Sequence, residues 1–192
     1  MKKVKMGPQT GLFPMPTLLI GAMVDGRPNF MTAAWGNIVE SEPPTLCLSI
    51  RRGRYTRKGF EVGSGLTVNV PAASQVREVD FCGIESGFKV DKIARCGFTV
   101  STCGATGAPM VEECPVNVDC KIDQIVELGA HSLVIASILE VYVAEDCIVD
   151  GALEVSKVDP LVYLMGPPKR YVHLGSPAGD AFSVGLGLRE TD

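Results

Sequence analysis

The segment Thr17–Val39 reads TLLIGAMVDGRPNFMTAAWGNIV, in which two apolar runs flank the dipeptide Asp25-Gly26. Asp-Gly between apolar runs is a strong hairpin signal, because both residues accept the positive φ that a type I′ turn requires. We therefore predict two antiparallel strands, over residues 17–24 and 29–39. The prolines Pro43-Pro44 end the second strand, since proline cannot donate to a strand ladder.

The rest of the chain continues in short elements separated by turns. Between residues 116 and 123 apolar and polar side chains alternate, as in a strand with one buried face. Residues 132–143 are more uniformly apolar, which predicts a strand covered by the core on one face and by a helix or a second subunit on the other. Further strands are predicted over residues 45–50 and 66–70, and short helices over residues 56–62, 74–82 and 91–95. Ser74 is expected to cap the second of these helices and Gly83 to end it. From Pro160 on, the tail is expected to consist mainly of loops. This pattern predicts a mainly β protein with some α+β elements, built as a small antiparallel barrel.

Composition limits the classes of partner. The chain has 192 residues, of which 46% are hydrophobic and 21% charged, so we expect one domain over residues 1–192 with a substantial core. Its formal charge of -4 argues against nucleic acid and anionic membranes as partners. The longest apolar run near the N-terminus, residues 18–24, is far below the ~20 residues that span a bilayer. We expect a cytoplasmic protein without a signal peptide or membrane helix.

The usual catalytic and metal-binding motifs are missing from the sequence. Seven cysteines contain no C-x-x-C pair, and only two histidines are present, so no metal site is expected. The thiols are expected to be reduced and mostly buried. The sequence contains no dinucleotide fingerprint, P-loop, nucleophile elbow or zinc-protease motif.

Three short segments nevertheless differ from their surroundings. In Asn29–Trp35 (NFMTAAW), small residues precede the only tryptophan, so a flat ligand can lie against the backbone there. In Ser49–Thr56 (SIRRGRYT), three arginines beside hydroxyl groups are the ingredients of a phosphate cradle. The third segment combines Ser86-Gly87 with Asp91-Lys92. Close strand packing and a solvated basic turn are the alternatives, but together the segments predict a planar, aromatic, phosphorylated ligand.

These segments, with Asp80–Gly83 (DFCG), Glu112–Asn117 (EECPVN) and Gly129–His131 (GAH), resemble the flavin reductase-like family of FMN-binding split barrels. The resemblance covers nearly the whole chain in order, and within the family it points to the flavoredoxin branch. It implies a homodimer that binds FMN near the subunit interface. It also implies transfer of hydride or electrons from NAD(P)H through FMN to a flavin or a redox partner protein.

The resemblance also assigns residues to the cofactor. It places the strand Thr32, Ala33, Ala34 and Trp35 along the flavin ring, largely through backbone groups. The residues near the ribityl phosphate are Ser49, Arg51, Tyr55 and Thr56, and Ser86 and Lys92 complete the phosphate site, with Asp91 orienting the lysine. Further cofactor-binding residues are Asn29, Met31, Cys82 and Gly87.

His131 matches a histidine that reductases of the family carry after Gly-Asp, on the nicotinamide side of the flavin. Here Ala130 replaces that aspartate, and Ala136 stands where a glycine is expected. Two functions therefore stay open: a reductase that uses NAD(P)H directly, and an FMN-containing electron carrier reduced by another protein. A barrel without flavin is a third alternative, which the cationic set Arg51, Arg54 and Lys92 disfavours.

Overall fold

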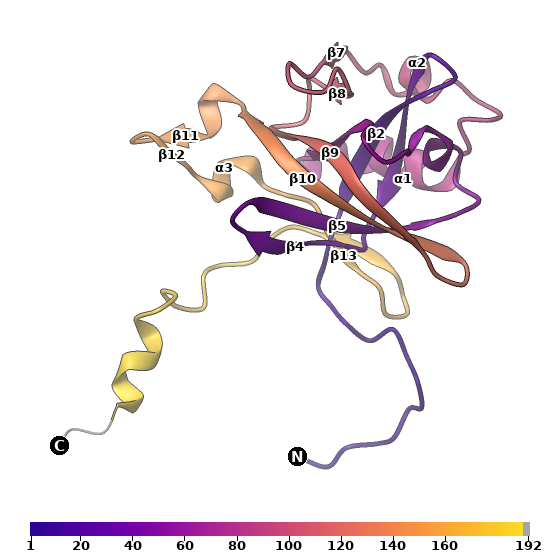
Figure 1. Cartoon of the computed structure of the whole chain (residues 1–192). Coiled ribbons are helices and arrows are strands. Elements are labelled where there is room, and N and C mark those ends of the chain that lie inside the picture. The colour runs from indigo at the N-terminus through magenta and orange to yellow at the C-terminus, as the bar shows by residue number, and fades with distance from the viewer. Residues whose placement is uncertain (190–192) are drawn as a thin grey trace.

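The computed structural model describes residues 1–189, and its centre is a seven-stranded antiparallel sheet (Figure 1). The strand order is β3-β2-β6-β9-β10-β5-β4. The strands are β2 (Leu18–Val24), β3 (Arg27–Ala33), β4 (Gly36–Ser41), β5 (Pro44–Arg51), β6 (Gly65–Val70), β9 (Val116–Glu127) and β10 (His131–Val143). Within residues 1–189 the edge strands β3 and β4 are not paired with each other, so the barrel is split there. The predicted mainly β, split-barrel fold is confirmed.

The β2–β3 hairpin forms as predicted, with Asp25 and Gly26 at φ 50° and 74°. The single strand predicted over residues 29–39 is wrong, because β3 ends at Ala33 and β4 begins at Gly36. β3 pairs with β2 whereas β4 pairs with β5, so the chain must change partners between them. The two residues at this change lie outside the strands, and this irregular step becomes part of the site below.

Two apolar layers lie on the two faces of the sheet. The barrel interior contains Ile20, Leu48 and Ile122, all at most 1% exposed. On the outer face of β2 and β3, Leu19 and Phe30 pack against the helices and the segment around Val111. β3 is thus held firmly although it is an edge strand.

Helices α1 (Val76–Ile84) and α2 (Lys92–Cys96) cover this outer face. Two predictions about α1 are wrong: Ser74 lies inside the 3-10 helix η2 (Ala73–Gln75) and caps nothing, and α1 continues past Gly83. Gly83 instead packs closely on β3, because a Cβ there would lie 3.3 Å from Thr32 Cβ, a tight contact. The helix predicted over residues 56–62 is the 3-10 helix η1 (Tyr55–Gly59).

The tail contains more regular structure than its predicted loops. β13 (Val162–Leu164) and β14 (Arg170–Val172) form a hairpin that pairs with β1 (Met15–Pro16). The remaining elements are β7 (Val100–Thr102), β8 (Pro109–Val111), η3 (Glu145–Cys147), β11 (Ile148–Val149), β12 (Ala152–Leu153), α3 (Val155–Val158) and η4 (Val184–Leu188). η4 lies well away from the barrel (Figure 1). No helix in residues 1–189 has the length and apolar character needed to cross a membrane.

Candidate functional site

A pocket of about 550 Å³ opens where β3 ends, and we call it the β3-end pocket. It collects residues from the end of β3, the end of α1, the turn before η1 and the β13–β14 hairpin. Its lining is Thr17, Thr32, Ala33, Ala34, Arg54, Asp80, Gly83, Ile84, Tyr163, Lys169 and Tyr171. The volume lies in the usual range of small-molecule sites. Only the fold brings these segments together, since they are spread over more than 150 positions of the chain.

The strand side of this pocket is flat and rich in backbone. Ala33 and Ala34 carry the smallest side chains after glycine, and Thr32 is turned to α1, where its hydroxyl donates to the Val79 carbonyl. An edge strand also presents backbone N–H and C=O groups that no neighbouring strand uses. This surface suits a flat heterocycle with hydrogen-bonding edges.

The charged groups of the β3-end pocket favour an anion. The half-buried Arg54 guanidinium donates through one nitrogen to the Gly83 carbonyl at 2.7 Å, which leaves other N–H groups for a ligand. Lys169 adds a second positive charge at the rim. Asp80 is occupied, because its carboxylate accepts a hydrogen bond from the Tyr171 hydroxyl at 2.9 Å. Burial and this carboxylate raise the pKa of Tyr171, so the phenol stays neutral.

Thr17 supplies an independent sign that a ligand belongs in the β3-end pocket. Its side chain is 2% exposed, yet its hydroxyl oxygen has no hydrogen-bond partner within the described residues. A buried polar group without a partner costs about 1–3 kcal/mol. A ligand with a polar edge would remove this cost.

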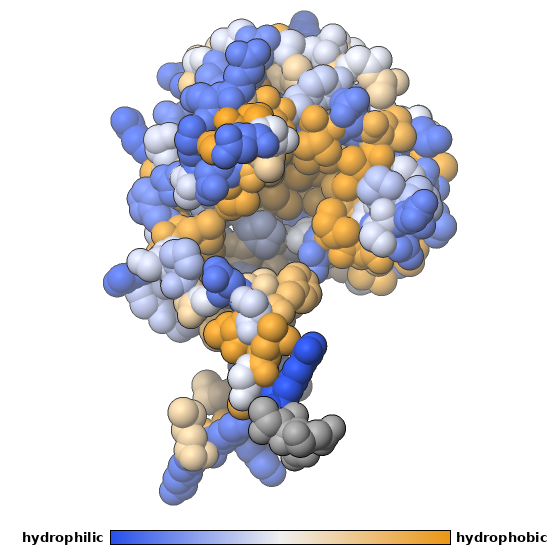
Figure 2. All heavy atoms as spheres, turned by 90° about the vertical axis from the view of Figure 1, so that its left-hand side faces the viewer, coloured by the Kyte–Doolittle hydropathy of each residue, from blue (hydrophilic) through white to orange (hydrophobic). Residues whose placement is uncertain are grey.

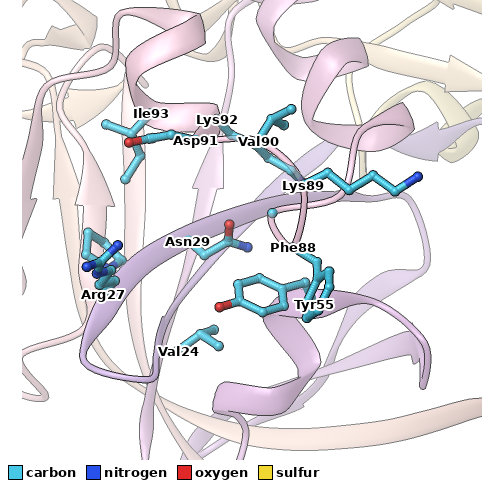
Figure 3. A pocket seen from close by; sticks show the side chains of 12 residues that line it. Val24, Arg27, Asn29, Tyr55, Phe88, Lys89, Val90, Asp91, Lys92 and Ile93 are labelled. Carbon is cyan, nitrogen blue, oxygen red and sulfur yellow. The ribbon is translucent and has the colours of Figure 1, made fainter.

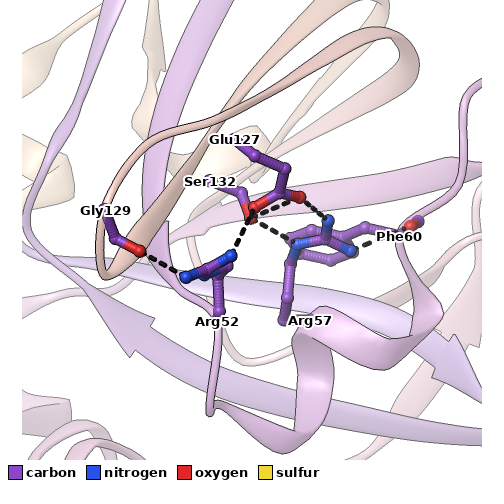
Figure 4. A network of polar contacts seen from close by, with 6 residues as sticks. All are labelled: Arg52, Arg57, Phe60, Glu127, Gly129 and Ser132. Atoms are coloured by element: carbon purple, nitrogen blue, oxygen red, sulfur yellow. Dashed lines mark hydrogen bonds and ion pairs between the residues drawn. The ribbon is translucent and has the colours of Figure 1, made fainter.

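The turn that carries Arg54 is fixed by a polar network with the tip of the β9–β10 hairpin (Figure 4). Arg57 donates to Ser132 Oγ at 3.0 Å, to Glu127 Oε1 at 2.8 Å and to the Phe60 carbonyl at 3.1 Å. The buried Ser132 hydroxyl is also bonded to Glu127. The network therefore ties Arg52 and Arg57, on either side of Arg54, to β9 and the β9–β10 turn.

This network predicts a pH dependence. The Ser132 hydroxyl, together with Arg57, lowers the pKa of Glu127 below its ordinary value of 4.5. A carboxylate with a lowered pKa stabilises the fold above its unfolded-state pKa, and this contribution is lost as the pH falls through the folded-state pKa. We expect Glu127→Gln to lose less stability than wild type between pH 6 and pH 3 in urea denaturation. Equal losses would contradict this role, and Glu112→Gln at an exposed site is the control.

Four other predicted residues gather in a different place, the β3-start pocket, of about 390 Å³ (Figure 3). These are Asn29, Tyr55, Gly87 and Lys92. The two β3 pockets share no lining residue. The Gly87 backbone packs so closely on Asn29 and Tyr55 that a Cβ would lie 2.1 Å from Asn29 Oδ1. The predicted ring residues Ala33 and Ala34 therefore lie at the end of β3, whereas the predicted phosphate residues Tyr55 and Lys92 lie near its start.

Trp35 and Ser49 line a third pocket, of about 1020 Å³, beneath the N-terminal segment. The imidazole of His131 is stacked on the Trp35 indole, with ring centroids 5.1 Å apart and planes at 30°. Arg51 lies opposite His131 in the β5–β10 ladder and is exposed. Trp35 follows Ala34 in the chain, but its side chain lines this third pocket and not the β3-end pocket.

The remaining predicted residues have internal partners. Met31 lies in the barrel core, and the buried Thr56 accepts a hydrogen bond from Asn29 Nδ2 at 2.6 Å. Cys82 is buried with its sulfur 3.9 Å from that of Cys96, and burial raises the pKa of its thiol to about 12. Ser86 accepts a hydrogen bond from the Phe88 N–H at 3.3 Å. Asp91 caps α2 by accepting from the Ala94 N–H at 3.0 Å.

Residues 10–168 match the family model described as the flavin reductase like domain. The chain belongs to this family. Flavoredoxin from Methanosarcina acetivorans is similar with a TM-score of 0.92 and 32% identity, over 98% of this chain and 100% of that one. Flavoredoxin of Desulfovibrio vulgaris (Miyazaki F) is similar with a TM-score of 0.88 and 35% identity, over 96% and 100%. The family and branch predicted from the sequence are confirmed.

A relative with a named activity is the NADH-dependent FMN reductase RutF of Enterobacter cloacae. It is 29% identical over 116 residues, which are 60% of this chain and 68% of the relative. Members of this flavin reductase-like family bind FMN. FMN is therefore the candidate ligand for the β3-end pocket.

Several residues that line the β3-end pocket were not predicted from the sequence to bind the ligand. Arg54 stands within the basic segment SIRRGRYT, which was predicted to bind phosphate, but the resemblance assigned that contact to its neighbours. Thr17, Tyr163, Lys169 and Tyr171 carry no motif, and only the pairing of β1 with β13 brings the last three to the pocket.

Proposed function

We propose that this protein is an FMN-dependent oxidoreductase that takes hydride from NAD(P)H and passes electrons to a flavin or a redox partner protein. The observation that supports it best is the β3-end pocket, which joins a flat strand surface to two cations and an orphaned hydroxyl. FMN has matching parts: a planar ring with polar edges and a phosphate dianion.

The residues present fit FMN. The ring would lie against Ala33 and Ala34, and the phosphate would be held by Arg54 and Lys169. Thr17 would give its free hydroxyl to a polar atom of the cofactor. The assignments of Ser86 and Lys92 to this phosphate stay predictions.

Bound FMN supplies the redox chemistry, accepting a hydride and releasing electrons singly or in pairs. The protein's part is to bind, orient and shield. The Arg54 guanidinium is held by the Gly83 carbonyl, and this contact does not depend on the cofactor. Trp35 follows the ring residue Ala34 in the chain and is stacked on His131, which is the candidate contact for nicotinamide.

The second candidate, an FMN electron carrier, is supported by the similarity to the two flavoredoxins over nearly the whole chain. The replacement of the family's aspartate by Ala130, next to His131, points the same way. In this case a partner protein would reduce the flavin.

The two functions are separated by anaerobic visible absorbance of the FMN-loaded protein. Addition of NADH, and separately of NADPH, in slight excess is expected to bleach the flavin band. A band that persists with both but is bleached by dithionite would contradict the reductase and favour the carrier. Failure to bind FMN at all would overturn both.

We also propose a homodimer. Exposed apolar side chains lie on β4, β9 and β10 and in the β9–β10 turn: Ile38, Val39, Val126, Leu128, Leu139 and Val141. Figure 2 shows apolar side chains gathered around a hollow on one face of the molecule. Light scattering coupled to size exclusion is expected to give twice the chain mass; a monomer at micromolar concentration would contradict this.

Thr17→Val tests the fit of the cofactor. Because the hydroxyl has no partner in the ligand-free protein, its removal should leave the free energy of unfolding unchanged or slightly higher. FMN affinity should fall about 2- to 12-fold, the value of one neutral hydrogen bond of ~0.5–1.5 kcal/mol. Fluorescence titration of FMN measures it. Unchanged affinity would remove Thr17 from the site.

A further inference from the structure

Cys82 and Cys96 form a pair of thiols that the proposed function does not use. Their sulfur atoms lie 3.9 Å apart, the first on α1 and the second on α2. The S–S bond of a disulfide is about 2.05 Å long, so the two sulfurs need to approach by only roughly 2 Å to form one. Both thiols are free in this structure, and their positions are those of potential disulfide partners.

An oxidant reaches this pair from one side only. Cys96 is half-buried, whereas Cys82 is completely buried in the apolar layer that also contains Leu19 and Phe30. Burial raises the pKa of both thiols, so little thiolate is present at neutral pH and the reaction with an oxidant is slow. The pair therefore stays reduced under brief exposure and responds to sustained oxidation.

The same end of α1 holds two cations through its backbone. The Cys82 carbonyl accepts a hydrogen bond from Lys92 Nζ at 2.8 Å, and the Gly83 carbonyl accepts one from Arg54 at 2.7 Å. Lys92 and Cys96 are four residues apart on α2, so they lie on one face of that helix. Cys82 thus contacts α2 both through its sulfur and through its carbonyl.

Closure of the pair would move these carbonyls. The Cys82 side chain is packed on all sides, so it has little freedom to rotate, and the end of α1 must shift toward α2 for the sulfurs to meet. Hydrogen bonds weaken when they are lengthened or tilted from their normal geometry. A shift at Cys82 and Gly83 would therefore leave Arg54 less well oriented for an anion.

We propose that Cys82 and Cys96 are a modification site, oxidised reversibly to a disulfide by hydrogen peroxide, and that closure of this disulfide lowers the affinity for FMN. Hydrogen peroxide is the product when dioxygen oxidises a reduced flavin, so a flavoprotein is exposed to this oxidant. The effect on FMN rests on the proposed function, whereas formation of the disulfide does not.

The reaction takes place in two steps. The Cys96 thiolate attacks one oxygen of hydrogen peroxide, the O–O bond breaks, and the leaving hydroxide takes a proton to become water. The Cys82 sulfur then attacks the sulfenic acid on Cys96, the S–O bond breaks, and a second water leaves as the S–S bond forms. Two thiols are oxidised and one peroxide is reduced to two waters.

The test is peptide mapping of the whole protein after treatment with hydrogen peroxide, removal of the peroxide and alkylation of the remaining thiols. Trypsin and chymotrypsin together cut after Arg95 and Phe98, which separates Cys96 from the later cysteines. Mass spectrometry is expected to find the Cys82 and Cys96 peptides joined, and dithiothreitol should release them. Fluorescence titration of the same samples is expected to give an FMN dissociation constant about 3- to 10-fold higher after oxidation, restored by dithiothreitol.

Single variants separate this pair from other thiols. Cys96→Ala should abolish the joined peptides and make FMN affinity insensitive to peroxide. Cys47→Ala is the matched control, because Cys47 is the other half-buried cysteine, and it should behave as wild type in both measurements.

Peptides of Cys82 and Cys96 that stay separate, or a disulfide of either with Cys114 from the same apolar layer, would overturn the proposal. A Cys82–Cys96 disulfide that leaves FMN affinity unchanged would overturn the coupling to the cofactor. Failure of the proposed function is distinguishable, because a protein that never binds FMN would still show or lack the joined peptides.

Discussion

Arg54→Ala is expected to weaken FMN binding by about 10- to 150-fold, the equivalent of ~1.5–3 kcal/mol for a hydrogen bond to a charged group. Arg54 is the half-buried cation of the β3-end pocket, and its bond to Gly83 already fixes its direction. The FMN affinity of Arg54→Lys should lie between those of wild type and Arg54→Ala, because lysine keeps the positive charge but lacks the planar guanidinium group. Fluorescence titration of FMN gives the three dissociation constants.

Repeating the FMN titration at several salt concentrations shows whether Arg54 acts through its charge or through packing. If Arg54 meets the phosphate, the difference between wild type and Arg54→Ala should shrink as ionic strength rises. Arg95→Ala, an exposed arginine on α2 outside the pocket lining, is the matched control and should leave FMN affinity unchanged. An Arg54→Ala protein with wild-type affinity would show that the phosphate lies elsewhere.

Phe30→Ala is expected to lower the free energy of unfolding by about 3–5 kcal/mol. Phe30 is completely buried between β3 and the helices, and its ring meets the Phe98 ring edge-on with centroids 6.3 Å apart. The substitution would leave a cavity beneath the strand that carries the pocket residues. Urea denaturation followed by circular dichroism measures the change.

Phe182→Ala is the control for this prediction, because that phenylalanine is fully exposed and should cost less than ~0.5 kcal/mol. Phe30→Leu should recover most of the loss, since it refills much of the volume. A loss below ~1 kcal/mol for Phe30→Ala would mean that the layer between β3 and the helices contributes little to stability.

The hairpin and the sheet were predictable because their signals are local. Asp25-Gly26 sets a two-residue turn, and the alternation after Val116 sets the face of β9, so both elements follow from neighbouring residues. The break of the strand at Ala34 was not predictable, because it results from a change of pairing partner between β2 and β5. Gly83 was wrongly predicted to end the helix for a similar reason: it packs closely on Thr32, which lies 51 positions earlier in the chain.

The site was predictable only in part. The Thr32–Ala34 strand and the basic segment were visible, and both approach the β3-end pocket through Ala33, Ala34 and Arg54. The resemblance groups Lys92 with them; the fold places Lys92 near the start of β3, and its assignment to the phosphate stays a prediction. Lys169 and Tyr171 come from the tail, where the sequence predicts only loops, so three-dimensional pairing was needed to find them.

The central claim, that FMN occupies the β3-end pocket, is tested most directly by the difference electron density of crystals grown with FMN. We expect the ring against Ala33 and Ala34 and the phosphate within hydrogen-bond distance of Arg54 and Lys169. Density that places the phosphate beside Lys92 and Tyr55, in the β3-start pocket, would contradict this account.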